Sequence, residues 1–378
     1  MLDEQADTDP NPPILNISNR LRRSPLFERV RNAGARAWSV YNRTVIGQWF
    51  ASLEEDYAHL KRAVQVWDVG GQRIVEISSP DATRLLQMTT PRDLAPMCDD
   101  QCYYMPMVDA TGRMLNDPLL VKVADRQYWL CQADGDMLMF LKGLSGGLGL
   151  DVTLSEPDVW TLAIQGPRAE DLAETVFGPA VRQLRFFRHM RVDVGGRDMI
   201  LARAGWSKQG GFELHVEGSA HAGPIWDRLM EAGRDLDVRA GCPNLIERVE
   251  GGLLSYGNDM TPDHTPFEAG LGRFCDMDHR TECLAWDALA AQQEPERQIR
   301  PVEIMGPRIP LVHELWPVTD ATGAFAGKVS SAAWSPEFQT NVAIAMIERA
   351  FWAPGTELSV ETPEGARKLI VCEKFWGR

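Results

Sequence analysis

Long hydrophobic runs are absent from this sequence. No apolar stretch in its 378 residues approaches the roughly 20 residues that a membrane-spanning helix needs. The first residues, MLDEQADTDPNPP, are acidic and rich in proline, so they lack the basic and then apolar pattern of an export signal. We therefore expect a disordered tail over residues 1–16 and a soluble protein of the cytoplasm with no membrane partner.

Basic residues are also in short supply. The chain has 39 Lys and Arg residues against 53 Asp and Glu residues, which gives a formal net charge of −14. Because nucleic-acid affinity comes largely from Lys and Arg side chains that neutralise phosphates, this balance argues against a nucleic-acid partner. Cysteine is scarce as well, with seven residues spread over the chain. An odd number of scattered cysteines is typical of reduced thiols, which again favours the cytoplasm.

Standard metal-binding motifs are missing. The cysteines include the patterns Cys98-x₃-Cys102 and Cys275-x₃-His279-x₃-Cys283. Thiolate and imidazole groups are zinc ligands, but these spacings match no standard zinc pattern, and free cysteines are commonly core thiols. We therefore expect no metal site.

What remains is the composition of an ordinary globular protein, with 44% hydrophobic and 24% charged residues. The chain exceeds the usual domain size of roughly 100–200 residues, which predicts two or three domains. Two glycine-containing stretches, 146–149 and 165–167, lack the glycine spacing and the lysine of a phosphate-binding loop. We interpret both stretches as turns.

The alternation of polar and apolar residues indicates an α+β unit over residues 65–157. Strands and helices are predicted within it, in chain order, as strands 65–69 and 73–77, helix 82–88, strands 102–107, 119–123 and 126–133, and helix 134–144. The glycine-rich Ser145-Gly146-Gly147 is expected to end the second helix.

A second strand–helix unit begins at residues 160–165, where an apolar strand breaks at Gly166-Pro167 and a helix starts near Arg168. It continues with strands at 189–203 and 212–217 and helices at 221–233 and 243–254. Beyond about residue 285, short alternating runs rich in Pro, Val and Gly predict a small all-β domain.

Two groups of residues are candidates for chemistry. Asn116-Asp117 is either a turn-forming pair or the place where a carboxylate holds a cation or takes a proton. Trp206 and Glu213 flank a loop with three glycines. Such a loop is either a hairpin with a core tryptophan or a site where backbone approaches a flat ligand, which the tryptophan covers and the carboxylate binds. The residues alone leave both alternatives open.

Six strings of residues go further than single motifs. They are DDQCYY (99–104), LNDP (115–118), GWSKQGGFE (205–213), GCPNLIERVE (241–250), LLSYGND (253–259) and WSPE (334–337). Together they resemble the T-protein superfamily and, within it, the dimethylsulfoniopropionate demethylases. The resemblance covers nearly all of the chain after the tail.

This resemblance implies an α+β fold, a three-domain cloverleaf. A ferredoxin-like domain is inserted into a discontinuous first domain that binds folate, and a β-barrel lies at the carboxyl end. The implied bounds are 17–64 plus 158–284 for the first domain, 65–157 for the ferredoxin-like domain and 285–378 for the barrel.

The resemblance also implies that tetrahydrofolate binds in a central channel. Glu213 matches a carboxylate that binds the pteridine ring. Trp206, Tyr104 and Phe187 match aromatic positions that line the same site. Asp117 matches an acidic residue near folate N5, which implies a catalytic role.

For the methyl donor, Tyr103 and Asn116 are expected to contact the substrate, with Tyr103 and Tyr104 shaping the cavity as a pair. Arg43 is a third expected contact and stands where the demethylases have histidine. Gly47 and His215 stand where those enzymes have proline and tyrosine. Donor choice is therefore expected to depend on Arg43, Gly47 and His215.

The implied reaction moves a methyl group from dimethylsulfoniopropionate to folate N5, giving methylmercaptopropionate and 5-methyltetrahydrofolate. A sulfonium methyl is electrophilic because its leaving group is a neutral thioether, so alignment at about 3 Å and a fixed charge environment suffice. Another onium or methoxy donor is the first alternative.

Two further alternatives rank lower. A folate-binding protein without turnover is expected to carry a KGCY-type motif, which this sequence lacks. A glycine-cleavage aminomethyltransferase is expected to carry an arginine where this chain has Asn244. A homodimer is the remaining expectation from the resemblance.

Overall fold

The computed structural model describes residues 18–377, so the predicted tail at 1–16 lies outside the described residues. Its first sheet has six strands in the order β13-β14-β15-β12-β4-β16, in which only β4 and β16 pair in parallel. The strands are β13 (His189–Asp193), β14 (Asp198–Ala202), β15 (Gly211–Glu217), β12 (Val159–Gln165), β4 (Val64–Asp68) and β16 (Val238–Gly241).

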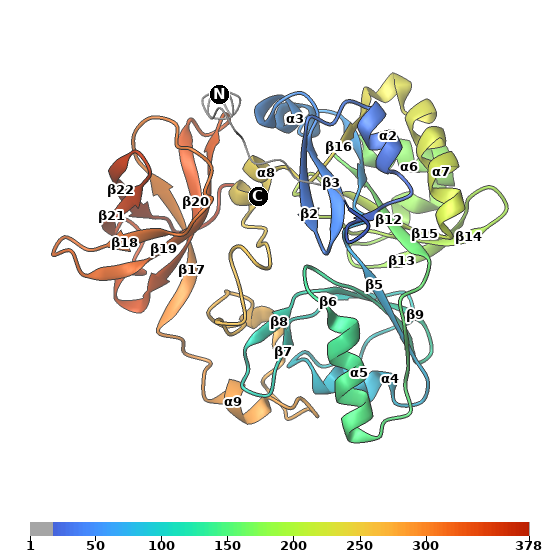
Figure 1. Cartoon of the computed structure of the whole chain (residues 1–378), viewed down its shortest axis with the longest axis horizontal. Coiled ribbons are helices and arrows are strands. Elements are labelled where there is room, and N and C mark those ends of the chain that lie inside the picture. Colours follow the sequence, from blue (N-terminus) through green and yellow to red (C-terminus); the bar gives the residue numbers. More distant parts are fainter. Residues whose placement is uncertain (1–17, 378) are drawn as a thin grey trace.

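Helices cover one face of this sheet (Figure 1). They are α2 (Phe27–Asn32), α6 (Ala169–Phe177) and α7 (Ser219–Ala232), with short 3₁₀ turns η1 (Pro179–Gln183) and η2 (Arg234–Leu236). Phe212, Leu214 and Val216 of β15 point into the apolar core beneath these helices. Because side chains alternate along a strand, Glu213 and His215 of β15 face the other side of the sheet.

A small three-stranded sheet precedes β4 in the chain. Its order is β1-β3-β2, with β1 (Arg22–Arg23), β3 (Thr44–Trp49) and β2 (Ala37–Tyr41). Asn42 and Arg43 join β2 to β3 with φ angles of 51° and 60°, as a two-residue hairpin turn requires. Helix α3 (Leu53–Leu60) follows and begins at Ser52, whose side chain accepts a hydrogen bond from Glu55 N at 3.1 Å.

The second sheet is the inserted one. Its order is β11-β5-β10-β9-β6, all antiparallel, with β11 (Thr153–Ser155), β5 (Ile74–Ser78), β10 (Gln127–Cys131), β9 (Leu119–Ala124) and β6 (Cys102–Tyr104). Helices α4 (Ala82–Met88) and α5 (Met137–Leu148) pack against it. The sequence β5-α4-β9-β10-α5-β11 is a ferredoxin-like arrangement. Strand β6 extends the sheet, and β7 (Met107–Val108) pairs with β8 (Met114–Asn116) in a short hairpin.

Two predictions for this inserted part are corrected by the structure. Residues 65–68, predicted to open the unit at 65–157, form most of β4, which pairs with β12 and β16 in the first sheet. Helix α5 does not end at Ser145-Gly146-Gly147 but continues to Leu148, so the interpretation of 146–149 as a turn is wrong. Buried residues on one side of α5 hold it against the sheet, which outweighs the cost of its glycines, and Gly149 in the left-handed region ends it.

A closed barrel forms the carboxyl end, in the order β17-β20-β19-β18-β21-β22. Its strands are β17 (Arg297–Ile304), β20 (Thr340–Glu348), β19 (Phe325–Ser335), β18 (Trp316–Thr319), β21 (Glu357–Thr362) and β22 (Gly365–Val371), with the 3₁₀ turn η4 (Arg349–Phe351). The prediction of a β-barrel is confirmed. One helix, α9 (Trp286–Ala290), lies before the barrel in the region predicted to be all-β.

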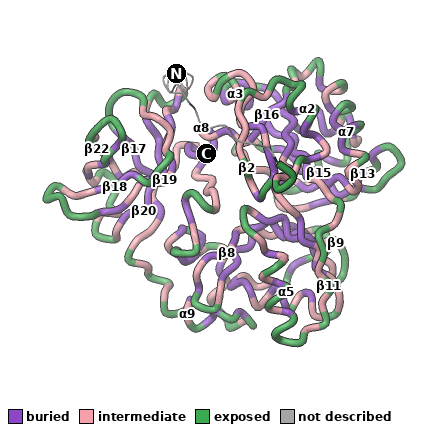
Figure 2. Tube along the Cα trace, viewed as in Figure 1, coloured by how far each residue is buried: buried purple, intermediate pink, exposed green. Residues whose placement is uncertain are grey.

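Helix α8 (Leu245–Gly251) lies between the first sheet and the barrel (Figure 1). It is shorter than the predicted helix at 243–254 because Gly252 adopts a left-handed conformation that ends it. Val249 of α8 shares one apolar core with Met114 of β8 and Ile344 of the barrel. The buried positions in Figure 2 accordingly run along α8 as well as the strands. A 3₁₀ turn, η3 (Gly272–Phe274), follows in the connecting segment.

Within residues 18–377, we find no helix with the length and apolar character needed to cross a membrane.

Candidate active site

Asp117 lies at the end of β8, directly beside Tyr104 of β6. The Tyr104 hydroxyl donates a hydrogen bond to Asp117 Oδ2 at 2.8 Å. Asp117 Oδ1 is buried and has no hydrogen-bond partner among the described residues. Burial raises the pKa of Asp117 to about 7, although the Tyr104 hydrogen bond acts in the opposite direction. The pair predicted from the sequence is therefore brought together, with one carboxylate oxygen left free.

Asn116 fixes the backbone around this carboxylate. Its Oδ1 accepts hydrogen bonds from Ala133 N at 2.9 Å and from Asp117 N at 3.1 Å. Its Nδ2 donates to Asp134 O at 2.8 Å. The buried amide thus orients Asp117 against the loop that follows β10. A contact between Asn116 and substrate stays a prediction.

Three aromatic residues near Asp117 were not identified from the sequence. The Tyr256 hydroxyl donates to Met114 O at 3.3 Å, and burial together with the Asp117 charge raises the pKa of Tyr256 to about 12. Burial and the same charge also raise the pKa of Tyr41. The Phe274 ring meets Tyr104 edge-on at 4.8 Å between ring centres. Tyr256 lies within the string LLSYGND, but Tyr41 and Phe274 follow no pattern that the sequence alone reveals.

Tyr103 takes a different environment from Tyr104. The two residues are neighbours in strand β6, so their side chains leave opposite faces of it. Tyr103 packs beside the core of the inserted sheet, with the Arg92 guanidinium 3.9 Å from its ring centre. The structure thus does not place Tyr103 beside Asp117, and its role in substrate binding stays a prediction.

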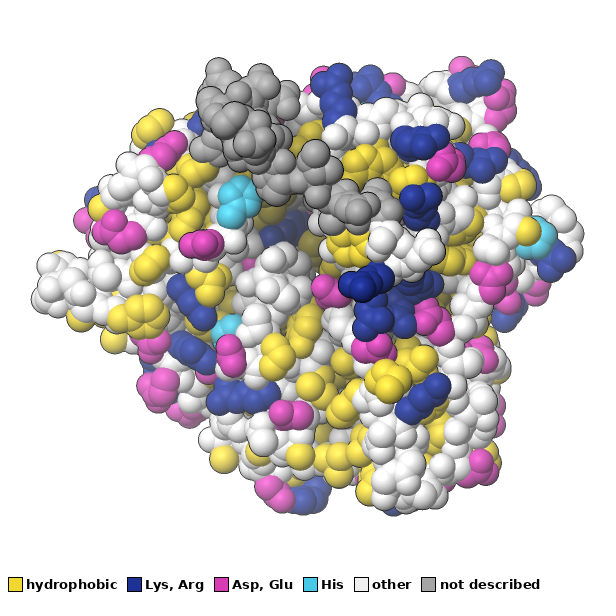
Figure 3. Space-filling view, viewed as in Figure 1, with side chains coloured by type: hydrophobic (Ala, Val, Ile, Leu, Met, Phe, Trp, Pro, Cys, Tyr) yellow, Lys and Arg dark blue, Asp and Glu magenta, His cyan; other side chains and the backbone are white. Residues whose placement is uncertain are grey.

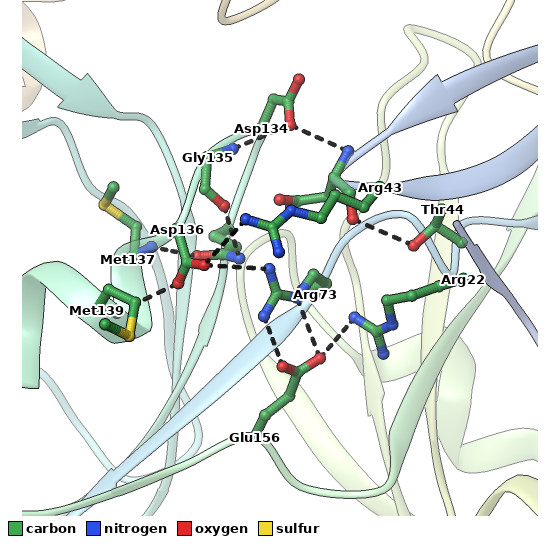
Figure 4. A network of polar contacts seen from close by, with 12 residues as sticks. Arg22, Arg43, Thr44, Arg73, Asp134, Gly135, Asp136, Met137, Met139 and Glu156 are labelled. Carbon is green, nitrogen blue, oxygen red and sulfur yellow. Dashed lines mark hydrogen bonds and ion pairs between the residues drawn. The ribbon is translucent and has the colours of Figure 1, made fainter. Parts of the chain in front are cut away.

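Arg43 lies on the surface at the tip of the β2–β3 hairpin. Its side chain is 71% exposed, and its Nη2 lies 3.7 Å from Asp136 Oδ2. Figure 4 shows Arg73 reaching both Asp136 and Glu156, where its Nη2 lies 2.6 Å from a Glu156 oxygen. Basic and acidic side chains are interspersed over the face of the molecule shown in Figure 3. The observed contacts of Arg43 join the hairpin to helix α5, and a substrate contact stays a prediction.

Glu213 faces away from the helix-covered side of the first sheet. It is 6% exposed, and no described residue donates a hydrogen bond to its carboxylate. Burial alone raises the pKa of Glu213 to about 7. An interior carboxyl without donors is costly unless a ligand supplies them. Glu213 is therefore suited to bind a flat molecule that presents N–H groups.

Phe187 lies between the two sheets, on the same side as Glu213. It packs against the apolar cluster that includes Cys102, and its carbonyl accepts a hydrogen bond from Cys102 N at 2.9 Å. Its ring stacks on Phe186 at 4.2 Å between ring centres. Burial raises the pKa of the Cys102 thiol, and the charge of the nearby Glu213 carboxylate raises it further. Phe187 and Glu213 thus meet at the same strand, β6, that carries Tyr104.

Trp206 lies over helix α8. The Arg248 guanidinium lies 5.8 Å from the Trp206 ring centre. Arg248 is itself buried and forms an ion pair with Asp259 at 2.7 Å. The Asp259 charge contributes to the raised pKa of Asp117, so these groups lie near one another. Phe187 and Glu213 therefore lie near strand β6, which also carries Tyr104, and Trp206 lies over α8, whose Arg248 pairs with the Asp259 that acts on Asp117. A common site for all five residues stays a prediction.

Among residues 18–377, no group of three or more His, Cys, Asp or Glu side chains is arranged to hold a metal ion.

Comparisons with known proteins decide the family. Residues 26–279 match the GCVT N-terminal domain, and residues 297–376 match the glycine cleavage T-protein C-terminal barrel domain. The chain belongs to the glycine-cleavage T-protein family. It is 53% identical over 359 residues to the dimethylsulfoniopropionate demethylase DmdA of Ruegeria pomeroyi, a match covering 95% of this chain and 98% of that protein.

More distant T-proteins match along similar lengths. An aminomethyltransferase of Lysinibacillus sphaericus is 28% identical over 376 residues, with 94% of this chain and 98% of that protein covered. The crystal structure of the glycine cleavage system aminomethyltransferase T of Bartonella henselae superposes with a TM-score of 0.85 at 21% identity. That match covers 94% of this chain and 98% of the other chain, which confirms the predicted T-protein fold.

Two residues at which this chain differs from related proteins, Asn244 and His215, have clear local contacts. Asn244 caps helix α8: its Oδ1 accepts from Ile246 N at 3.0 Å, and its Nδ2 donates to Leu53 O at 2.9 Å. His215 lies in the layer between the sheets, edge-on to Trp129 at 5.8 Å between ring centres. Burial lowers the pKa of His215 to about 3, so the ring is neutral. A direct effect of His215 on donor choice stays a prediction.

Proposed function

We propose that this T-protein transfers a methyl group from dimethylsulfoniopropionate to tetrahydrofolate. The observation that carries the proposal is the 53% identity to a dimethylsulfoniopropionate demethylase along 98% of that enzyme's length. Identity to aminomethyltransferases is much lower, at 28% for the example from Lysinibacillus sphaericus. The chain is a folate-dependent methyltransferase, and neither a different methyl donor nor glycine-cleavage activity is favoured.

The residues present fit folate. Glu213 has a buried carboxylate without donors, and a pterin ring offers adjacent N–H groups that pair with a carboxylate. Phe187 and Trp206 supply aromatic surface for a flat ring system. When bound, tetrahydrofolate supplies the N5 nitrogen that accepts the methyl group.

Asp117 is placed to act on the reacting groups. A sulfonium carries a positive charge, and the free, buried Oδ1 of Asp117 gives that charge a counter-ion in a site with few competing donors. Because methyl transfer to an N–H nitrogen releases a proton, the same carboxylate also serves as an acceptor for it. A pKa of about 7 allows Asp117 to hold and release a proton near neutral pH.

The rings around Asp117 complete the environment of the donor. The Tyr104 hydroxyl donates a hydrogen bond to Asp117 Oδ2. Burial and then the nearby Asp117 charge raise the pKa of Tyr41 and of Tyr256. Aromatic faces attract onium groups through their quadrupoles. No nucleophilic side chain is required, since the thioether leaves as a neutral molecule.

The setting of the enzyme is a further part of the proposal. All seven cysteines lie within the described residues and are free thiols, which supports a reducing compartment such as the cytoplasm. The net charge of −14 supports small-molecule substrates over nucleic acid. We also propose a homodimer, on the basis of the family resemblance, with light scattering of the purified protein as its test.

One assay separates the candidate reactions. Purified protein is incubated with tetrahydrofolate and, in separate reactions, with methylated sulfonium, ammonium and methoxy compounds, and 5-methyltetrahydrofolate is quantified. We expect dimethylsulfoniopropionate to give the highest rate. A faster reaction with another donor supports the alternative donor instead. Folate binding with no product from any donor supports a binding protein and contradicts the proposal.

A further inference from the structure

The loop at residues 205–211 carries Trp206 and leads directly into the strand of Glu213. Gly205 and Gly210 have φ angles of 153° and 78°, which glycine adopts readily. Because glycine also adopts many other conformations, the loop backbone alone does not select this shape. The shape of the loop must therefore come from contacts made by other parts of the chain. Gly166 N donates a backbone hydrogen bond to Gly210 O at 3.0 Å, and the side chains of Gln165 and Glu247 accept the hydrogen bonds that hold the rest of the loop.

Gln165 holds the first half of the loop. The Ser207 hydroxyl donates to Gln165 Oε1 at 2.7 Å. Gly205 lies so close to this side chain that a Cβ at its position would be 2.0 Å from Gln165 Nε2. Gln165 is fully buried at the end of β12. This end of the loop is therefore fixed to the first sheet.

Glu247 of helix α8 holds the second half. Its Oε1 accepts hydrogen bonds from Lys208 N at 2.6 Å and from Gln209 Nε2 at 3.2 Å. The side chain is 2% exposed, so these bonds to a carboxylate are shielded from water. Charge-assisted bonds of this kind are roughly twice as strong as bonds between neutral groups.

The other side of Glu247 borders a cavity. A cavity of about 360 Å³ lies behind the loop, lined in part by Glu247, Lys61, Lys208, Glu250 and Trp376. Glu247 Oε2 is buried there without a hydrogen-bond partner among the described residues. Because this side is not packed, the loop has room to move when the bond from Lys208 N is lost.

Arg248, the next residue of helix α8, connects this helix to Trp206 and, through Asp259, to Asp117. Arg248 lies under the Trp206 ring and pairs with Asp259, whose charge reaches Asp117. Helix α8 therefore contacts the loop through Glu247 and the ring on that loop through Arg248. Placement of Trp206 depends on both contacts.

We propose that Glu247 is a positioning residue for folate: it holds the loop at residues 205–211 in the shape that presents Trp206 and Glu213 to the cofactor. The inference rests on the proposed function for the identity of the ligand. Glu247 acts through the loop and touches no reacting atom. Its loss therefore weakens folate binding more than it slows the chemical step.

Two substitutions at Glu247 test this role. Glu247→Ala removes the acceptor, and we expect the Kd for tetrahydrofolate, measured by equilibrium titration, to rise about tenfold or more. Glu247→Gln keeps a carbonyl oxygen for Lys208 N, so its Kd is expected to stay within about threefold of wild type. In both variants, kcat at saturating folate and KM for the methyl donor are expected to change less than about threefold.

A third variant reaches the loop without altering the carboxylate. A Cβ on Gly251 would lie 2.6 Å from Lys208 Cγ, so Gly251→Ala displaces Lys208 and is also expected to raise the Kd for folate. This variant decides the question if Glu247→Ala does not fold. Glu337→Gln is the matched control, since Glu337 lines the same cavity but bonds to Tyr57 and Lys61, so its Kd is expected to be unchanged.

The outcomes separate this inference from the proposed function. Folded Glu247→Ala and Gly251→Ala proteins with wild-type Kd overturn the inference, as does an equal loss of binding in Glu247→Ala and Glu247→Gln. If the variants weaken folate binding as expected but wild-type protein transfers no methyl group, the proposed function fails and the role of Glu247 stands.

Discussion

Asp117 has the property on which the proposed chemistry depends, a buried carboxylate with one free oxygen and a pKa of about 7. A cationic donor binds best when this group is ionised, so kcat/KM for the donor should rise with pH through about 7 and level off above it. Asp117→Asn should lower kcat/KM by roughly tenfold or more and remove this inflection. A pH–rate profile of both proteins, with folate affinity as control, measures the effect. Near-normal turnover in the variant contradicts the role.

Glu213 links cofactor binding to stability through its own titration. Burial raises its pKa from 4.5 to about 7, so the folded chain binds this proton more tightly than the unfolded chain. The free energy of unfolding should therefore fall as pH rises from 4.5 to about 7. Glu213→Gln removes this dependence. The free energy of unfolding of the variant, relative to that of wild type, should therefore increase by on the order of 3 kcal/mol between pH 4.5 and about 7.

Denaturant unfolding of both proteins at several pH values checks this prediction, and folate titration of the variant should show weaker binding. A stability difference between the two proteins that does not change with pH would show that Glu213 titrates normally.

Helix α5 shows why element boundaries were harder to predict than elements. Its glycines resemble a stop signal, but burial of Met137, Leu141 and Ser145 carries the helix past them. An added Cβ at Gly147 meets no atom within 4 Å. Gly147→Ala should therefore raise the free energy of unfolding by about 0.5–1 kcal/mol. Gly149→Ala is the control and should destabilise, because Gly149 has a φ of 65°. Equal effects at both positions would contradict the argument.

Alternation of polar and apolar residues predicted the strands themselves. In the folded chain the same alternation puts Glu213 of β15 on the side away from the apolar core and separates Tyr103 from Tyr104 in β6, although the sequence analysis grouped these two tyrosines at one site. The strand at 65–68 was predicted correctly as a strand but assigned to the wrong sheet. Pairing of β4 with β12 is a contact between distant segments, and no local pattern encodes it.

Across the whole molecule, one buried ion pair connects three parts of the chain. Arg248 of α8 pairs with Asp259 of the connecting segment and donates to Ser331 Oγ of the barrel at 2.6 Å. Asp259→Asn leaves a buried guanidinium without its charge partner and should lower the free energy of unfolding by about 3–5 kcal/mol. Ser331→Ala should cost about 1 kcal/mol, since the ion pair remains. Chemical denaturation measures both, and a small effect of Asp259→Asn would mean that water reaches the pair.

The assembly of the site from distant segments also limits what sequence alone reveals. The family strings identified Asp117, Glu213 and Trp206, which local patterns left undecided. Tyr41 and Phe274 come from a hairpin and a 3₁₀ turn that only the folded chain brings to Asp117 and Tyr104. Their contribution depends on packing between domains and therefore required the structure.

The fate of the methyl group tests the account most directly. The enzyme is given dimethylsulfoniopropionate with ¹³C in its S-methyl groups together with unlabelled tetrahydrofolate, and the products are followed by NMR. We predict that the label appears in the N5-methyl group of 5-methyltetrahydrofolate, in an amount equal to the methylmercaptopropionate formed. Label in methanol, or methylmercaptopropionate formed without labelled folate, would contradict direct transfer.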